Sequence, residues 1–292
     1  MINMNWFYYI DKPLKYSSFD VIRVLKKKLN IKRIGHTWTL DPLATGGLLI
    51  AVWNYTKLIS YLEKDKKEYE FVINFDWETE SFDLGTQIEY FNEEIIKKFK
   101  KEVNKEKIQD VLNKKFSWKI KQIAPKYSAK KINWKRAYDL ARAGEEFEIK
   151  ANDVEIYNIK ILDYNFPKLR LKAKVSAGTY IRSIAFDLAR ELWLSGSYVS
   201  FLRRTFIEWL DVSKAQKLDK FDEENKLDLK EIFKNKQFIS LDEEIQKKID
   251  NWLKIKWTFD YKIWEDLFVY KDWNITNIVE YNGEQLIPKK KI

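Results

Sequence analysis

The segment from residue 35 to residue 46, Gly-His-Thr-Trp-Thr-Leu-Asp-Pro-Leu-Ala-Thr-Gly, constrains the fold more than any other part of the chain. It lies between a hydrophobic run that ends at Ile34 and another that spans residues 48–52, and proline and glycine interrupt it. This pattern predicts a shaped loop, and loops held on a rigid scaffold commonly carry catalytic and binding residues. The loop contains the only histidine of the chain, His36, together with the aspartate Asp41. These two side chains are therefore the first candidates for a functional site.

The composition excludes several kinds of site. A chain of 292 residues can bury a core large enough for one main domain and a small second one without covalent staples. It has no cysteine, which rules out disulfides and thiolate metal sites, and a single histidine cannot form a histidine cluster for zinc or iron. We therefore expect no metal.

Charge and hydropathy indicate the compartment and the kind of partner. No run approaches the roughly 20 apolar residues that span a bilayer, and the first ten residues do not resemble a secretion signal, so we expect a cytoplasmic protein with no membrane association. The net charge of +10 favours a polyanionic partner such as nucleic acid. An AT-rich genome, which raises the lysine content of every protein, is the alternative explanation.

Hydrophobic periodicity predicts an α+β fold. Apolar residues at helical spacing, with Ser17 or Ser18 as the cap, indicate a helix over 18–29, and the same spacing recurs over 179–192. The remaining elements alternate irregularly, with strands expected over 6–10, 69–75, 154–164 and 169–175 and helices within 93–115 and 136–143. This order lacks regular βαβ units and favours an α+β domain.

The C-terminal part of the chain reads differently. After a polar stretch from about 214 to 250, short strand-like runs at 253–259, 266–270 and 274–281 predict a small β-rich module. We place the domains at 1–235 and 236–292.

Tryptophan occupies positions that suit glycine. The chain has 8 glycines, against about 20 expected from average usage, and 12 tryptophans. Five tryptophans follow Asn or Asp, namely Trp6, Trp77, Trp134, Trp252 and Trp273. Asn-Gly and Asp-Gly are turn signals because both residues accept positive φ, which is costly for tryptophan. Either the indoles pack in the core or stack on bases, or the source decodes UGA as glycine and this sequence was translated with UGA as tryptophan.

With glycine in place of Trp38, the loop closely resembles a motif of the bacterial tRNA pseudouridine synthase B family. Further segments match that family in order: Asp11-Lys12-Pro13 with Ser17-Ser18, Lys67-Glu68-Tyr69, residues 122–129 and 131–138, Gly178 to Ser183 and Tyr198 to Thr205. Residues 79–83 follow the family only loosely, and Trp209 lies near a family glycine without aligning with it. The resemblance covers roughly residues 5–213.

The resemblance implies a fold, an activity and a set of site residues. The fold is a pseudouridine synthase catalytic domain with a mixed, mainly antiparallel sheet, followed by a PUA-like RNA-binding module. The implied activity is conversion of uridine 55 in the tRNA T loop to pseudouridine without a cofactor, by base flipping, glycosidic cleavage, rotation and rejoining through C5. The catalytic residues carried over are Asp41, Tyr69 and Arg182, and the substrate-binding residues are His36, Lys12, Tyr180 and Leu202.

One mechanistic detail and two alternatives remain open at this stage. The sequence does not show whether Asp41 attacks the ribose or abstracts a proton. We expect a monomer that binds the T arm without an obligate protein partner. The alternatives are the guide-RNA-dependent relative, which acts with partner proteins on ribosomal RNA, and a tRNA-binding folding chaperone without chemistry.

Overall fold

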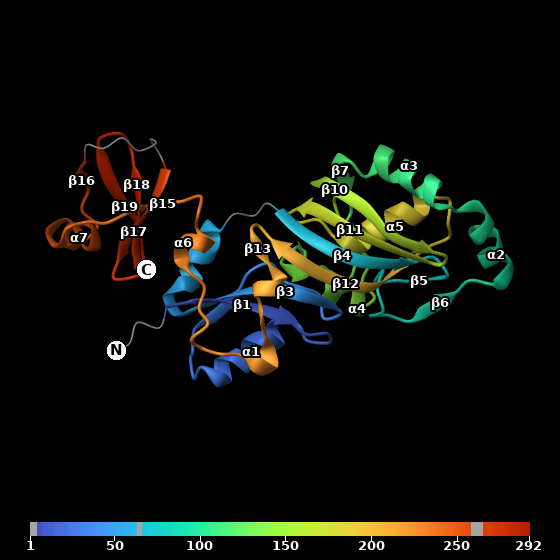
Figure 1. Cartoon of the computed structure of the whole chain (residues 1–292), viewed down its shortest axis with the longest axis horizontal. Coiled ribbons are helices and arrows are strands. Elements are labelled where there is room, and N and C mark those ends of the chain that lie inside the picture. Colours follow the sequence, from blue (N-terminus) through green and yellow to red (C-terminus); the bar gives the residue numbers. More distant parts are fainter. Residues whose placement is uncertain (1–4, 63–65, 258–264) are drawn as a thin grey trace.

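A computed structural model describes residues 5–62, 66–257 and 265–292. Two sheets dominate these residues: a 10-stranded sheet in the N-terminal and middle parts of the chain, and a five-stranded sheet near the C-terminus (Figure 1). The larger sheet has the strand order β14-β1-β3-β12-β4-β11-β10-β7, with β2 paired to β3 and β13 paired to β12. Only the β1/β14 and β3/β12 pairs are parallel. The expected mixed, mainly antiparallel α+β fold is therefore confirmed.

The central strands are buried on both faces, which explains their continuous apolar sequence. In β1 (Phe7–Lys12) and β3 (Ala44–Val52), side chains alternate between two hydrophobic clusters. Tyr8 and Ile10 face α1 (Ser18–Lys28), whereas Phe7 and Tyr9 face the side on which the C-terminal sheet packs. This is the period-two alternation of a strand covered on both sides.

A second core lies under the other half of the large sheet. Helices α2 (Glu93–Glu102), α3 (Lys105–Lys115) and α5 (Ile181–Glu191) pack there against β4 (Lys66–Asn74), β11 (Lys168–Ser176) and β10 (Asn152–Asn165). Apolar residues at i, i+3 and i+4 on α5, such as Ile181, Ile184 and Ala185, supply the helix side of this core. The loop that contains Asp41 and the start of α5 are thereby held against a rigid sheet.

Further elements lie in the same part of the chain, up to residue 220. They are β2 (Ile34–His36), η1 (Trp53–Tyr61), β5 (Trp77–Thr79), β6 (Ile88–Tyr90), β7 (Trp118–Gln122), β8 (Lys131–Ile132), β9 (Lys135–Arg136), α4 (Ala137–Arg142), β12 (Tyr198–Ile207), β13 (Leu210–Asp211), η2 (Val212–Lys214), β14 (Gln216–Lys217) and η3 (Leu218–Lys220). Ser17 caps α1 with a reciprocal capping box, so the cap is Ser17 rather than Ser18.

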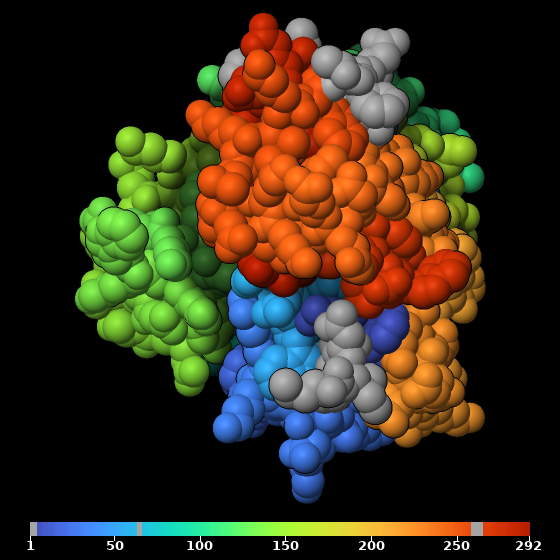
Figure 2. Space-filling model, turned by 90° about the vertical axis from the view of Figure 1, so that its left-hand side faces the viewer, coloured from blue at the N-terminus to red at the C-terminus, as the bar shows by residue number. Residues whose placement is uncertain are grey.

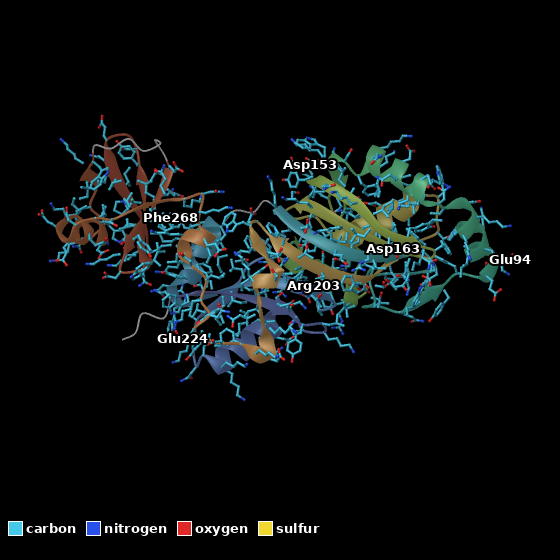
Figure 3. All side chains as sticks on the ribbon, viewed as in Figure 1. Glu94, Asp153, Asp163, Arg203, Glu224 and Phe268 are labelled. Atoms are coloured by element: carbon cyan, nitrogen blue, oxygen red, sulfur yellow. The ribbon has the colours of Figure 1, made fainter. Side chains whose placement is uncertain are left out.

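The small sheet is formed by five strands of the described C-terminal residues. Its order is β15-β17-β18-β19-β16, from β15 (Gln237–Ile239), β17 (Glu265–Lys271), β18 (Asn274–Tyr281), β19 (Gln285–Lys291) and β16 (Ile255–Lys256), with α7 (Glu243–Asp250) beside it. Phe268 of β17 packs against Phe233, which follows α6 (Leu229–Ile232), at the junction with the large sheet (Figure 3). In the space-filling view this module, in orange and red, lies directly beside the blue N-terminal residues (Figure 2).

Two expectations need comment here. The polar stretch 214–250 contains α6, β15 and α7, which the sequence pattern did not predict. Of the strand expected over 253–259, only β16 (Ile255–Lys256) forms, and residues 258 and 259 lie outside the described residues.

Candidate active site

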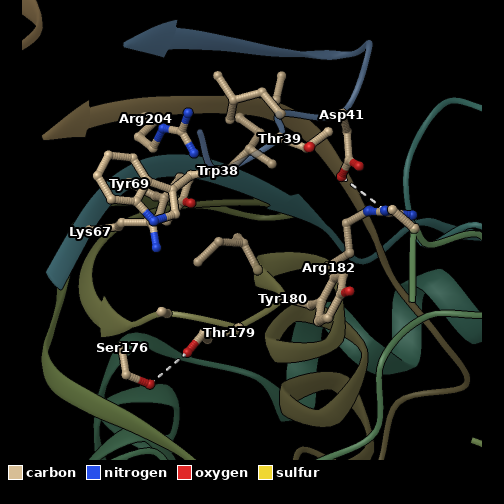
Figure 4. Close-up of a pocket in the computed structure, with 17 residues that line it drawn as sticks. Trp38, Thr39, Asp41, Lys67, Tyr69, Ser176, Thr179, Tyr180, Arg182 and Arg204 are labelled. Atoms are coloured by element: carbon tan, nitrogen blue, oxygen red, sulfur yellow. Dashed lines mark hydrogen bonds and ion pairs between the residues drawn. The ribbon is translucent and has the colours of Figure 1, made fainter. Parts of the chain in front are cut away.

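A pocket of about 360 Å³ opens beside the loop between β2 and β3 (Figure 4). Four of the predicted site residues line it, from four different elements: Asp41 from the loop, Tyr69 from β4, Arg182 from α5 and Leu202 from β12. Tyr180, the residue that precedes α5, lines it as well. The volume is within the range of small-ligand pockets, about 300–1,000 Å³.

The Asp41 loop is held on its buried side by a side chain of α1 and by a close backbone contact with β12. The Ser18 hydroxyl accepts from the Leu40 N–H at 2.9 Å and donates to the Leu40 carbonyl at 3.2 Å, which ties the loop to α1. At the other end, Gly46 adopts a φ of 107°, and a Cβ there would lie 2.2 Å from the backbone oxygen of Arg204 on β12. Only glycine fits that contact, so the loop returns to the sheet in a fixed register.

Arg182 holds the Asp41 carboxylate. Its Nη2 lies 2.9 Å from Oδ2 of Asp41, and the arginine side chain is 4% exposed while the aspartate is 38% exposed. The same guanidinium donates to the carbonyl oxygens of Ser81 at 2.9 Å and Tyr127 at 3.0 Å. Three loops therefore converge on one buried cation, and the carboxylate that faces the pocket is fixed by a charge-assisted hydrogen bond.

A second aspartate supports Arg182 from the buried side. Oδ2 of Asp83 lies 3.6 Å from Nε of Arg182, and Oδ1 accepts from the hydroxyl of Ser81 at 2.7 Å. Asp83 thus balances the buried arginine, so that Asp41 remains at the pocket. In the sequence, Asp83 belongs to a segment that resembles the family only loosely. No local pattern indicated that it would pair with Arg182.

Arg182 lies in the first turn of α5, and Gln122 orders that end of the helix. The Gln122 side chain accepts from the Tyr180 N–H at 2.8 Å and donates to the Tyr180 carbonyl at 3.1 Å. Helix N-termini leave backbone N–H groups without partners, so a side-chain amide at this position is stabilising. Burial raises the pKa of the Tyr180 hydroxyl, with a smaller opposing effect from Ser128.

The far side of the pocket is aromatic and basic. Tyr69 is 8% exposed and pairs with Arg204 across the β4/β12 ladder. Arg204 is 1% exposed; its Nε donates to the Gly47 carbonyl at 2.8 Å, and its Nη2 has no hydrogen-bond partner among the described residues. Lys67 also lines the pocket, and its ammonium lies 5.2 Å from the ring centroid of Trp38. Neither Arg204 nor Lys67 was predicted, because a buried cation on a strand has no signature in sequence.

Trp38 occupies part of this pocket. Its indole lies over Lys67 on the side of the pocket opposite Arg182 (Figure 4). Its backbone φ is 51°, a left-handed conformation that bulky residues rarely adopt. The ring fills space that the loop would otherwise leave open.

Two predicted binding residues lie outside the pocket lining. Lys12 is fully buried beneath the loop, where its ammonium donates to the carbonyls of Pro13, Tyr16 and Pro42 and so supports the loop; its substrate-binding role stays a prediction. Burial lowers the pKa of Lys12 to about 8. His36 lies on β2, paired with Ile50, and its RNA-binding role stays a prediction.

The surroundings of His36 favour the neutral form of its imidazole. Burial lowers its pKa, and the positive charge of Arg204 lowers it further. Its Nδ1 is buried and has no hydrogen-bond partner among the described residues.

Across the described residues no group of three His, Asp or Glu side chains is arranged to hold a metal ion. No described helix has the length and apolar character needed to cross a membrane.

Comparison with known proteins identifies the family. Residues 26–181 match the TruB family pseudouridylate synthase (N-terminal domain). The chain belongs to the TruB family. The predicted resemblance is thus confirmed, and the pocket of this TruB-family chain brings Asp41, Tyr69 and Arg182 together.

Relatives support the same assignment over most of the chain. It is 34% identical to tRNA pseudouridine synthase B of Francisella philomiragia over 99% of this chain and 95% of that protein. It is 35% identical to the Aquifex aeolicus protein of the same name, over 73% of this chain and 71% of the relative. Among solved structures, an H/ACA ribonucleoprotein bound to a substrate RNA containing 2′-deoxyuridine is similar with a TM-score of 0.69, at 16% identity, over 99% of this chain and 85% of the other. A Cbf5-Nop10-Gar1 complex has the same TM-score at 17% identity, over 98% and 84%. At that identity the structural likeness shows the fold alone.

Proposed function

We propose that this protein converts uridine 55 in the T loop of tRNA to pseudouridine, with Asp41 as the catalytic carboxylate. The observation that carries the proposal is the Asp41–Arg182 pair at a pocket walled by Tyr69 and Leu202, in a chain of the TruB family. The relatives at 34–35% identity are named tRNA pseudouridine synthase B, which supports tRNA as the substrate.

The reaction needs a carboxylate in a protected site. The C1′–N1 bond of the uridine breaks, the uracil turns, and C1′ bonds to C5, while a proton leaves C5 and another binds N1, so the product is an isomer of the substrate. An aspartate that stays ionised at the pocket can act first as a nucleophile or base at the ribose and later accept the C5 proton. Arg182 positions that carboxylate, and Tyr69 provides a flat wall for the uracil.

The target nucleotide must leave the RNA fold to reach Asp41. A uridine in a folded T loop is packed inside the RNA, and enzymes that act on a base extrude it into a pocket, at a cost of a few kcal/mol. Lys67 and Arg204 place positive charge on the far side of the pocket, where a backbone phosphate would be stabilised. The net charge of +10 lies in residues 1–235, which favours RNA binding by that part of the chain. The C-terminal module, residues 236–292, has ten lysines and ten acidic residues and would hold the rest of the tRNA through local contacts.

The alternatives make different predictions. A guide-RNA-dependent enzyme would need partner proteins, and the chain is 34–35% identical to the bacterial enzymes but only 16–17% identical to the proteins in the H/ACA-type structures. A chaperone would bind the T arm and leave the uridine unchanged. The Asp41–Arg182 geometry favours an enzyme over a chaperone, because binding alone does not need a fixed carboxylate beside the bound base.

A T-arm stem-loop assay tests the proposal. The protein alone, with Trp38→Gly to clear the pocket, is incubated with a stem-loop that carries tritium on C5 of uridine 55, because formation of the C1′–C5 bond releases that tritium to water. The matched control RNA has its label on another uridine of the same stem-loop. Release from position 55 only is expected. Tight binding without release would favour the chaperone, and release only on addition of a guide RNA and partner proteins would favour the guided enzyme.

A further inference from the structure

Tryptophan is concentrated at backbone positions that favour glycine. Thirteen non-glycine residues among those described have positive φ, and seven of them are tryptophan. The seven are Trp38, Trp53, Trp118, Trp134, Trp193, Trp252 and Trp273, with φ between 51° and 71°. Among non-glycine residues, Asn and Asp are enriched in this region, and a bulky side chain there is an outlier that costs about 1–2 kcal/mol. The whole chain has only 12 tryptophans, so chance does not explain this preference.

Two of these tryptophans end helices in the Schellman motif. After α5, the N–H of Trp193 donates to the Arg190 carbonyl, and the next N–H, of Leu194, donates to the Ala189 carbonyl. Trp252 and the residue after it repeat this pair of bonds at the end of α7. The motif places its C′ residue in the left-handed conformation, and glycine is the usual residue there.

The same chain provides a direct comparison for these helix ends. Helix α4 ends with an identical pair of hydrogen bonds, and its C′ residue is Gly144, with a φ of 70°. Helix α1 does the same with Asn30, with a φ of 48°. Four helices thus share one ending: two use residue types that the conformation accepts, and two use tryptophan.

Two more tryptophans lie in two-residue hairpin loops. Ile132 pairs with Lys135 across Asn133-Trp134, and Lys271 pairs with Asn274 across Asp272-Trp273. Both loop residues have positive φ in each hairpin, 45° and 71° in the first and 47° and 65° in the second. This is the geometry of the type I′ turn, for which Asn-Gly and Asp-Gly are the preferred pairs.

Trp38 and Trp53 pack against hydrophobic clusters, but the side chains at the other five positions make little contact that would repay the strain. Trp134 is 92% exposed, Trp193 85% and Trp273 79%, while Trp118 and Trp252 are more than half exposed. Large aromatic residues are normally stabilised by burial. An exposed indole on a strained backbone has no structural explanation in the chain as written.

Not every tryptophan that follows Asn or Asp has the backbone conformation that favours glycine. Trp6 and Trp77 also follow Asn or Asp but have no positive φ, and the Trp77 ring stacks on Tyr90 at 5.0 Å. Trp209 has no positive φ either; in its hairpin Glu208 does. These three therefore stand outside the set, which is defined by backbone conformation rather than by the preceding residue.

We propose that the native protein carries glycine at positions 38, 53, 118, 134, 193, 252 and 273, because the codon at these positions is decoded as glycine in its source. A single reassigned codon accounts for both the shortage of glycine and the surplus of tryptophan. It also accounts for the coincidence of tryptophan with Schellman, type I′ and other left-handed positions. Independent errors at seven positions would not select one conformation.

The change matters most at position 38. The Trp38 indole lines the pocket beside Lys67, and glycine would remove that ring from the space next to Tyr69. The native site would then be wider and its basic side more accessible to the backbone of an extruded nucleotide. This consequence rests on the proposed function, whereas the decoding does not.

Peptide mass spectrometry of the protein purified from its own cells tests the decoding directly. Glycine is expected at all seven positions, and the gene is expected to use UGA there rather than UGG. Tryptophan in the native peptides, or UGG codons at these positions, would overturn the proposal. Neither readout depends on enzymatic activity, so it stands or falls separately from the proposed function.

Recombinant variants test the consequence for the pocket. Trp38→Gly is expected to raise turnover of the T-arm stem-loop at least tenfold over the chain with tryptophan, and the matched control Trp53→Gly, which removes an equally strained indole outside the pocket, is expected to leave it within twofold. Equal turnover with Trp or Gly at 38 would overturn the pocket consequence. Loss of turnover in every variant, with glycine found by mass spectrometry, would count against the proposed function alone.

Discussion

Replacement of Arg182 by methionine should both destabilise the protein and uncouple Asp41 from the pocket. Arg182 is nearly fully buried and joins the Asp41 carboxylate to the carbonyls of Ser81 and Tyr127, with Asp83 behind it. Methionine preserves most of the side-chain volume but leaves the carbonyls without their donor and Asp83, which is 13% exposed, without its countercharge.

The magnitude follows from these contacts. Removal of one partner of a buried ion pair costs about 3–5 kcal/mol, and we expect a loss in this range in the free energy of unfolding. For a chain of 292 residues, an unfolding entropy of about 2.1 cal/mol/K per residue means that each kcal/mol lowers Tm by about 1.6 °C, so the fall should be about 5–8 °C. The partial exposure of Asp41 places the expected loss toward the lower end.

Arg203 provides a matched control. It forms an equally short ion pair, with Nη2 2.8 Å from Oδ2 of Asp11, but the two side chains are 30% and 20% exposed and lie outside the pocket lining. Arg203→Met should cost about 1–2 kcal/mol and preserve turnover. Thermal unfolding followed by circular dichroism and stem-loop turnover measured well below both midpoints separate stability from catalysis.

A conservative variant keeps the test informative if Arg182→Met does not fold. Arg182→Lys retains the charge, but a single ammonium nitrogen replaces the two guanidinium nitrogens that contact Asp41, Ser81 and Tyr127. It should therefore fold, bind RNA with unchanged KM and show kcat lowered by about 10–100-fold. If Arg182→Met were no less stable than Arg203→Met, or if Arg182→Lys kept full kcat, then Arg182 would not hold Asp41 in place as argued.

Three further predictions concern the strained tryptophans and the buried basic groups. Trp193→Gly should raise the free energy of unfolding by about 1 kcal/mol, and Gly144→Trp at the equivalent helix end should lower it. Trp77→Gly, which removes a stacked indole, should lower the free energy of unfolding by about 3–5 kcal/mol. Chemical denaturation checks the sign of all three changes. The pKa of His36, the sole histidine, should be below the ordinary 6.5 in an NMR titration because burial and a neighbouring arginine disfavour the imidazolium, so stability falls as the pH drops below 6.5; a pKa at or above 6.5 contradicts this. Because burial lowers the pKa of Lys12 to about 8, the unfolded chain binds more protons between about pH 8 and 10.5, and the stability of the wild type relative to Lys12→Met should rise across that window; a flat difference would refute it.

Elements with strong hydrophobic periodicity were predictable from sequence. The helix expected over 18–29 is α1, the strands at 154–164 and 169–175 are the hairpin of β10 and β11, and α5 covers most of 179–192. Each has a long apolar face or alternates cleanly, so local pattern and tertiary burial agree. Helix α7 was missed because its two apolar positions, Ile245 and Ile249, are surrounded by charge, although Asp242 caps it in a recognisable way.

The site was predictable only where motifs carried it. Asp41, Tyr69 and Arg182 were named through the family resemblance, and the structure brings all three to one pocket. The buried partners Asp83 and Arg204 act through contacts between strands and loops far apart in the sequence, which no local pattern contains. The same holds for Lys12, whose burial under the loop follows from the β1/β3 pairing.

The account depends most on the carboxylate of Asp41. The direct test is single-turnover release of tritium from C5 of uridine 55 by the protein with glycine at position 38, compared with the same protein carrying Asp41→Asn. The substitution preserves the side-chain shape, so RNA binding should be within about threefold while the rate of release falls at least about 10³-fold, which corresponds to about 4 kcal/mol of transition-state stabilisation. Release by Asp41→Asn at a rate near that of the parent would contradict the assignment of Asp41 as the catalytic residue.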